Sequence, residues 1–217
     1  MIREFAAIDV YYLLLAARWT IALTALAFVG GGLFGIVVAV MRVSPFLPLR
    51  AFGAAYVNLV QGIPLLGWLF VFFFGLPILA GVQVSPWIAA TVAFSFYAGA
   101  FLGEIWRGCL QSIPRQQWEA GAALGLGFGE QLRHVIVPQA VRVAIPPTVG
   151  FLVQLIKNTS LGAVIGFVEL TREGQLTNAA TYRPFTVYIA VAAIYFAMCF
   201  PLTQLSRRLE RRLRVAR

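Results

Sequence analysis

The feature that most constrains this chain is an uncharged stretch that fills residues 51–103, between Arg50 and Glu104. It exceeds the roughly 20 apolar residues that one helix needs to cross a bilayer core of about 30 Å, and it suits two such helices. Turn-forming residues gather at residues 75–86, so we expect the break there. Because the chain is 60% hydrophobic and only 12% charged, a soluble domain is excluded. The sequence predicts an integral membrane protein.

Other apolar segments raise the expected number of membrane-spanning helices to five. Lipid offers the backbone no hydrogen bonds, whereas a helix satisfies its own polar groups, so each crossing is expected to be helical. The predicted fold class is an all-α membrane protein, formed by a single transmembrane domain over residues 1–217. The expected spans cover about residues 19–41, 52–74, 87–106, 143–167 and 185–206.

The first 18 residues carry charges within an apolar segment, namely Arg3, Glu4, Asp9 and Arg18. We interpret residues 1–18 as an interfacial N-terminal helix that leads into the first span. The alternative that this segment only lengthens the span remains open. A cleaved signal peptide is not expected, because a longer apolar segment follows at once in place of a polar domain.

The arginines predict the orientation of the chain. Five spans place the termini on opposite sides, and positive residues favour the cytoplasmic side. A cytoplasmic C-terminus puts twelve arginines inside, six in the tail over residues 207–217 and six in the loops, and leaves four outside. We therefore expect an external N-terminus, a cytoplasmic loop at residues 107–142 and a cytoplasmic basic tail. This placement assigns the net charge of +9 to topology and membrane lipid, and we expect no nucleic acid partner.

The long polar interruption at residues 112–138 is predicted to form two helical segments. Glycines at positions 125, 127 and 129 end the first, and the second runs to about Val137 and stops before Pro138. Small residues on the first segment would let another surface approach closely. From periodicity alone, an amphipathic connector resting on the membrane surface is an equal alternative.

This interruption resembles the EAA signature of binding-protein-dependent ABC importer permeases, which reads E-A-A, three residues, G, nine residues, I-x-L-P. The chain has EAG at residues 119–121, Gly125 at the expected spacing and VIVP at residues 135–138, so Gly121 and two valines depart from the pattern. Further blocks, in the same order, are similar to the polar amino acid uptake branch of that family. These are QGIPLL at 61–66, FGLP at 74–77, SIPR at 112–115, PQA at 138–140, KNTSL at 157–161 and ELT at 169–171.

The resemblance implies an ABC type I importer permease fold in a bacterial inner membrane, with a cytoplasmic coupling helix. It implies transport of an amino acid from periplasm to cytoplasm by alternating access, with no enzyme activity and no cofactor in this chain. ATP and magnesium would be held by two ABC ATP-binding subunits, and the sequence has no G-x-x-x-x-G-K-[ST] loop of its own. A second permease subunit and a periplasmic amino-acid-binding protein are the other implied partners. The residues that would contact the ATPase are Glu119, Ala120, Gly121 and Gly125.

Lys157 is the most costly residue in the expected spans, since a lysine near mid-bilayer costs on the order of 3 kcal/mol. Two interpretations stay open: it attracts the α-carboxylate of the substrate, or it pairs with Glu104 or with free backbone carbonyls. Polar residues of the spans could line the path or bond between helices. The candidate path residues are Lys157, Asn158, Thr159, Ser160, Gln61, Ser95, Tyr97 and Glu104.

Two other function classes are weighed against this assignment. An intramembrane enzyme would need a nucleophile with a base or an acidic metal cluster, and the single His134 lies outside the spans, so we expect no catalytic residue and no metal. An ATP-independent carrier or channel formed by self-association is the alternative. We expect Cys109 and Cys199 to be apolar fillers, and residues 169–183 to form a polar external loop that is solvated or meets the binding protein. The transported amino acid, and whether the two permease subunits are identical, stay open.

Overall fold

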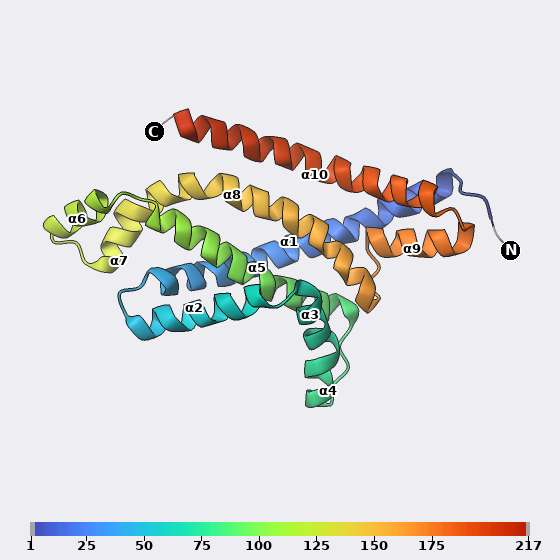
Figure 1. Cartoon of the computed structure of the whole chain (residues 1–217), viewed down its shortest axis with the longest axis horizontal. Helices are drawn as coiled ribbons and strands as arrows, with labels where there is room; N and C mark the ends of the chain where they lie inside the picture. The colour runs from blue at the N-terminus through green and yellow to red at the C-terminus, as the bar shows by residue number, and fades with distance from the viewer. Residues whose placement is uncertain (1–2, 216–217) are drawn as a thin grey trace.

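The structure is a computed structural model that describes residues 3–215, and within them every regular element is a helix. Long helices run along one axis, with α6 and α7 at one end of the bundle and α9 at the other (Figure 1). The chain starts near α9 and finishes towards the opposite end. The four longest helices are α1 (Ala7–Val43), α5 (Pro86–Gln111), α8 (Val137–Asn158) and α10 (Pro184–Val215).

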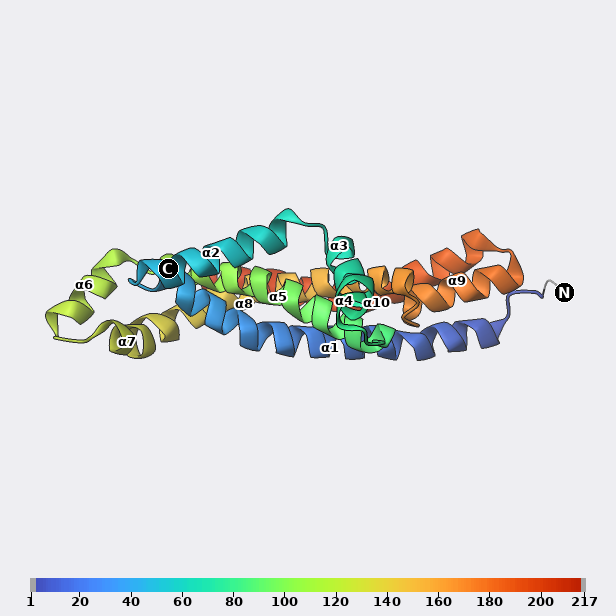
Figure 2. The same ribbon diagram turned by 90° about the horizontal axis from the view of Figure 1, so that it is seen from below.

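The described residues contain four stretches that are long and apolar enough to cross a membrane as single helices. A bent pair of helices forms a fifth if it is counted as one span. The predicted all-α membrane fold is therefore confirmed. Seen from the second direction, the bundle is long and narrow, with α1 along one side of it (Figure 2).

The N-terminal segment is not a separate helix. The sequence predicts an interfacial helix over residues 1–18, whereas α1 runs without a break across that boundary, as in the alternative that lengthens the first span. The charges of the segment are satisfied locally, because Asp9 is buried, forms an ion pair with Arg3 and accepts a hydrogen bond from the backbone N–H of Ala6 at 2.9 Å. At about 1.5 Å per residue, α1 is about 55 Å long, well beyond the thickness of a bilayer core.

The span predicted at about residues 52–74 is sharply bent and starts and ends at other residues. Helix α2 (Leu47–Gly62) ends at Ile63, which is extended, and the chain then turns by 99° into the segment Leu65–Ala80. Pro64 explains the turn, because a proline disfavours helical geometry in the residue before it. The segment Leu65–Ala80 projects sideways from the bundle (Figure 1). It contains α3 (Leu65–Phe70), a π turn (Val71–Gly75) and α4 (Leu76–Ala80).

The second helical segment of the polar interruption does not stop before Pro138 as the sequence predicts. Helix α7 (Phe128–Gln131) continues through a π turn (Leu132–Ile136) directly into α8. A proline inside a helix lacks one hydrogen-bond donor and clashes with the carbonyl four residues earlier, and a wider π turn relieves both problems. Pro77 follows a π turn in the same way and stays inside a helix, so the chain breaks at Gly81, where φ is +66°, within the range of residues 75–86 that the sequence predicts.

The remaining boundaries also differ from the predicted ones. Helix α5 extends to Gln111, the fourth span ends in a 3₁₀ helix (Thr159–Ile165), and α10 continues through the predicted tail to Val215. The predicted polar loop at residues 169–183 is mostly helical, as α9 (Leu170–Thr181). Its N-cap is Glu169, whose carboxylate accepts a hydrogen bond from the backbone N–H of Arg172 at 3.0 Å, and such caps stabilise short helices.

Helices α1 and α5 form the closest pair in the bundle, and glycines make this possible. A Cβ on Gly31 would lie 2.9 Å from the carbonyl oxygen of Ser95, and a Cβ on Gly103 would lie 2.6 Å from a methyl group of Val38. Small residues that let helix backbones approach closely are typical of membrane helix interfaces. This pair gives the α6 end of the molecule a stiff support.

Candidate functional site

The polar interruption forms a helical hairpin at the tip of the bundle, which we call the α6–α7 hairpin (residues 112–131). Helix α6 (Arg115–Ala123) starts after Pro114 and ends in a left-handed turn at Gly125, where φ is +78°. The N–H of Leu126 donates to the carbonyl of Gly121 at 3.1 Å, and the N–H of Gly125 donates to that of Ala122 at 2.9 Å. This pair of bonds is the Schellman arrangement, which requires a residue that tolerates positive φ.

The four residues of the EAA-like motif have different surroundings. Glu119 and Ala120 are exposed on α6, and Glu119 forms an ion pair with Arg115 at 2.9 Å. Gly121 is buried, and a Cβ there would lie 3.0 Å from the side chain of Gln131. The structure therefore brings Glu119 and Ala120 to the surface, whereas the small size of Gly121 serves the packing inside the hairpin. Gly125 lies at the exposed turn.

The hairpin is fixed to the helices of the bundle by an apolar cluster. Ile113, Leu132 and Ile136 are buried in it together with residues from the ends of α1 and α5. Trp118 stacks on Phe128 at the edge of this cluster, with ring centroids 6.0 Å apart. A displacement of the hairpin would therefore be transmitted to several spans, because a packed cluster resists local deformation.

Sequence reasoning missed one exposed residue of the hairpin. Leu124 is 80% exposed at the turn after α6, which makes it the most exposed large apolar side chain among the described residues of the hairpin. Single exposed leucines are common, so the exposure alone decides little. The sequence contains a signal that predicts this exposure. Leu124 directly precedes a glycine that ends a helix, and both lie in a polar loop.

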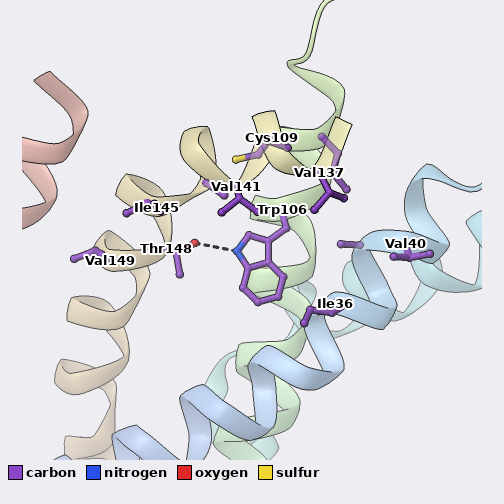
Figure 3. A pocket seen from close by; sticks show the side chains of 13 residues that line it. Ile36, Val40, Trp106, Cys109, Val137, Val141, Ile145, Thr148 and Val149 are labelled. Atoms are coloured by element: carbon purple, nitrogen blue, oxygen red, sulfur yellow. Dashed lines mark hydrogen bonds between the residues drawn. The ribbon is translucent and has the colours of Figure 1, made fainter. Parts of the chain in front are cut away.

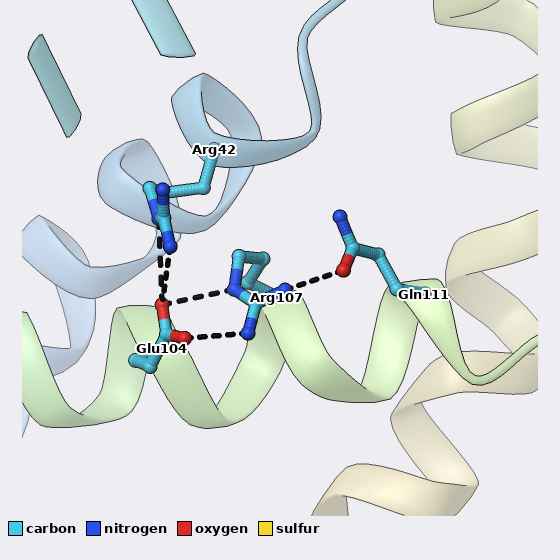
Figure 4. A network of polar contacts seen from close by, with 4 residues as sticks. All are labelled: Arg42, Glu104, Arg107 and Gln111. Carbon is cyan, nitrogen blue, oxygen red and sulfur yellow. Dashed lines mark hydrogen bonds and ion pairs between the residues drawn. The ribbon is translucent and has the colours of Figure 1, made fainter. Parts of the chain in front are cut away.

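Glu104 belongs to an ion network and not to a pair with Lys157. One carboxylate oxygen accepts hydrogen bonds from Arg42 at 3.2 Å and from Arg107 at 2.9 Å, and Arg107 also bonds to Gln111 (Figure 4). Of the alternatives left open for Lys157, an ion pair with Glu104 is therefore not formed among the described residues. Since Arg42 ends α1 and the other members lie on α5, the network ties these two helices together near the hairpin.

The residues around Lys157 lie where α8 changes into the 3₁₀ helix. Lys157 is exposed in the last turn of α8. The hydroxyl of Thr159 donates to the carbonyl of Ile156 at 2.6 Å, and that of Ser160 donates to the carbonyl of Lys157 at 2.7 Å. Both hydroxyls thus satisfy the backbone of this helix end, and Thr159 is buried.

A polar patch forms between α5 and α8, which we call the amide patch (Tyr97, Gln154 and Asn158). The side-chain amide of Gln154 donates to that of Asn158 at 2.9 Å, and Tyr97 lies next to Asn158. Gln154 is exposed and was missed by sequence reasoning, although its spacing of four residues from Asn158 places both on one helix face. The patch offers amide and hydroxyl groups from two spans to a polar ligand.

Two other candidate path residues lie away from this patch. Ser95 lies against α1, since a Cβ on Gly30 would be 2.8 Å from its hydroxyl oxygen. Gln61 is exposed near the end of α2. The structure therefore brings Tyr97 and Asn158 together, and it places Ser95 between two helices.

Glu169 is a buried acidic residue whose role the sequence did not reveal, because it was expected in a polar external loop that is solvated or meets the binding protein. Its carboxylate accepts hydrogen bonds from the Tyr195 hydroxyl at 2.7 Å, from the Thr20 hydroxyl at 3.4 Å and from the N–H of Arg172. Burial raises the pKa of this carboxyl above its ordinary value, and these hydrogen bonds offset part of the rise. Glu169 thus joins α1, α9 and α10 at the end of the bundle opposite the hairpin.

Comparisons with known proteins agree with this architecture. Residues 31–215 match the sequence model of a family described as binding-protein-dependent transport system inner membrane component. The chain is 38% identical to a probable glutamine ABC transporter permease protein, GlnM, of Bacillus subtilis, over 89% of each chain. It is 34% identical to the glutamine transport system permease protein GlnP of Escherichia coli, over 92% of this chain and 91% of that one.

Solved structures show the same fold. A crystal structure of an amino acid ABC transporter with histidines includes a chain with a TM-score of 0.88 and 31% identity, covering 98% of this chain and all of that one. A chain of the MetNI methionine ABC transporter has a TM-score of 0.70 at 22% identity, which supports the fold alone. The chain therefore belongs to the binding-protein-dependent transport system inner membrane components, among the amino acid ABC permeases, and has the fold of an ABC type I importer permease.

Proposed function

We propose that this chain is the membrane-spanning subunit of an ATP-driven importer that moves an amino acid from the periplasm to the cytoplasm by alternating access. The observation that carries the proposal is the α6–α7 hairpin, which exposes Glu119 and Ala120 at the tip of the bundle and is packed on the ends of α1 and α5. A rigid element of this kind can pass a movement of a partner to the spans. The names of the amino acid ABC permeases to which the chain is similar support the same class of cargo.

In this proposal other chains carry out ATP hydrolysis and substrate delivery. Two ATP-binding subunits would bind and hydrolyse ATP with magnesium, while this chain binds no cofactor. A second permease subunit would complete the path, and a periplasmic amino-acid-binding protein would deliver the substrate. The hairpin end is assigned to the cytoplasm, because Arg207, Arg208 and Arg211 lie on that side of the last span. The N-terminus is then periplasmic.

The proposed contacts with the ATP-binding subunit are the exposed groups of α6. The Glu119 carboxylate can accept charge-assisted hydrogen bonds once it leaves Arg115, and such bonds contribute more than neutral ones. Ala120 allows close approach, and Leu124 can enter an apolar depression of the partner. Gly125 preserves the turn that positions these groups, so its role here is conformational.

The experiment is a charge reversal of Glu119 in the assembled transporter. Glu119→Lys should lower both ATPase co-purification and uptake by about 10- to 100-fold, the equivalent of one lost charge-assisted hydrogen bond and added repulsion. Glu210→Lys is the matched control, since this exposed glutamate lies in α10 outside the hairpin. Unchanged uptake and co-purification in the Glu119 variant would refute the coupling assignment. Transport that does not respond to ATP at all would favour a self-associated carrier or channel.

A second experiment addresses the substrate path. We assign the α-carboxylate of the amino acid to Lys157 and the neighbouring amide patch, because a cation and amide donors suit a carboxylate. Lys157→Met should assemble normally, as the side chain is exposed, and should raise the KM for uptake about tenfold. Wild-type uptake by this variant would remove Lys157 from the path and leave it a structural role.

A further inference from the structure

A groove on the side of the bundle lies close to the hairpin end. It has a volume of about 440 Å³ and is bordered by the last turns of α1 and α5 and the first half of α8. Ile36 and Val40 form one wall, Cys109 lies at its end, and Val141 and Ile145 form the other wall (Figure 3). The indole N–H of Trp106 is within the groove, but it already donates to the hydroxyl of Thr148 at 2.9 Å.

The chemistry of the groove determines what can fill it. Its lining is almost wholly apolar, and the indole N–H and the hydroxyl to which it donates satisfy each other, so water gains few hydrogen bonds there. All three bordering helices belong to stretches that are apolar enough to span a membrane. The natural solvent of such a surface is the acyl chain of a lipid, which gains dispersion contacts with every wall.

Positively charged side chains at the hairpin end favour a lipid with an anionic headgroup. Arg142 is not itself a lining residue, but it directly follows Val141 and is three residues before Ile145, so it lies on α8 beside residues that line the groove. Side chains on a helix lean towards its N-terminus, which for α8 is the hairpin end, and a long arginine therefore reaches towards the level of the headgroups. Among the described residues, Arg142 forms no ion pair, so its charge is available.

The basic C-terminal part of α10 packs on α8 at Pro146, which is next to lining residue Ile145. The hydroxyl of Ser206 donates to the carbonyl of Pro146 at 2.9 Å, which fixes the position of α10 beside α8. The two helices run in opposite directions here (Figure 1), so Arg207 and Arg208 follow Ser206 from the level of Pro146 towards that of Arg142 and the hairpin. Basic pockets between membrane helices attract anionic lipid headgroups.

We propose that this groove holds one acyl chain of an anionic phospholipid from the leaflet at the hairpin end, with Arg142 binding its phosphate. The lipid would fill the space between α1, α5 and α8 next to the hairpin and so stabilise the part of the fold that supports it. This site does not depend on the transport activity or on the ATP-binding subunit.

The test uses the purified chain in vesicles of phosphatidylcholine and phosphatidylglycerol at 3:1, followed by detergent extraction and native mass spectrometry of the retained lipid. The wild-type chain should retain one phosphatidylglycerol with at least about a fivefold preference over phosphatidylcholine, the effect of one arginine near a headgroup. Ala144→Phe fills the groove and should abolish retention. Ala25→Phe, on an exposed part of α1 outside the groove, is the matched control and should retain lipid as the wild type does.

Arg142→Gln tests binding of the lipid headgroup separately from binding of the acyl chain, because it alters only an exposed side chain. It should retain lipid but lose the preference for phosphatidylglycerol. The proposal is overturned if Ala144→Phe retains phosphatidylglycerol as the wild type does, or if Arg142→Gln keeps the full preference. It is also overturned if the wild type retains no lipid and Ala144→Phe separates paired permease chains, because the groove would then be a contact between two copies.

Discussion

Replacement of Glu169 by alanine should loosen the end of the bundle opposite the hairpin. The carboxylate is fully buried and is contacted by Tyr195 of α10, Thr20 of α1 and the first turn of α9. Alanine removes all three contacts at once and leaves a cavity. The perturbation therefore measures what this single side chain contributes to holding three helices together.

The loss in the free energy of unfolding is the sum of the contributions of the individual contacts. Loss of the N-cap of α9 costs about 1 kcal/mol. Loss of the 2.7 Å bond from Tyr195 adds about 1–2 kcal/mol, and the penalty is moderate because this hydroxyl still has Thr171 at 3.0 Å. The cavity adds a smaller amount. We expect Glu169→Ala to lower the free energy of unfolding by about 2–4 kcal/mol.

Glu169→Gln should cost much less, about 1 kcal/mol, because the amide keeps the shape and one acceptor oxygen. It should also remove a pH dependence. Burial raises the pKa of Glu169 in the folded state above its ordinary value of 4.5, so the folded protein binds this proton more tightly than the unfolded chain. The stabilisation from this group is full below pH 4.5 and is lost as the pH rises through the folded pKa. The wild type should therefore lose stability over that range, and Glu169→Gln should not show this loss.

The assay is unfolding in mixed micelles by added dodecyl sulfate, followed by circular dichroism at several pH values. Glu173→Ala is the control, because Glu173 lies in the first turn of the same helix and forms no side-chain hydrogen bond or ion pair among the described residues. It should cost at most about 1 kcal/mol through the helix dipole. Glu169 does not hold the three helices together if Glu169→Ala costs no more than the control, or if the glutamine variant is as unstable as the alanine variant.

Three further substitutions test other parts of the fold in the same unfolding assay. Gly31→Ala should cost about 1–3 kcal/mol, because its Cβ would overlap that of Ala98, whereas Gly32→Ala, with its nearest neighbour at 3.7 Å, should cost nothing. Gly125→Ala should cost about 1–2 kcal/mol from backbone strain alone at φ +78°, and a neutral result would mean that the hairpin turn changes conformation. Glu104→Gln should cost about 1–2 kcal/mol by weakening the bonds to its two arginine partners, and an unchanged stability would show that the network contributes nothing.

Sequence reasoning recovered the fold class and the family, because both depend on patterns along the chain. Long uncharged stretches have one stable outcome in lipid, a set of helices. The spacing of Glu119 and Gly125 in the hairpin and of Pro138 after it was likewise visible in the sequence. The failures concern residues whose surroundings come from distant segments, as with Glu104, which binds Arg42 on another helix, 62 positions away.

The boundaries of helices were decided by tertiary structure. Pro64 ends a helix, whereas Pro138 and Pro77 lie inside helices. The sequence around these three prolines does not distinguish the two outcomes. A π turn precedes Pro138 and Pro77 but not Pro64. Because a π turn is wider than an α-helical turn, it forms only where the neighbouring helices leave room for it.

The sequence alone therefore determined that the chain lies in a membrane and that it crosses the membrane as helices. It also determined that a polar hairpin lies between two of these spans. Only the tertiary structure decided that Gly121 faces inward while Glu119 faces outward, and that Glu169 is buried beneath Tyr195 and Thr20. The physical reason is that hydrophobicity and helical period act over neighbouring residues. Burial and hydrogen bonding of a single side chain depend on segments that approach it only after folding.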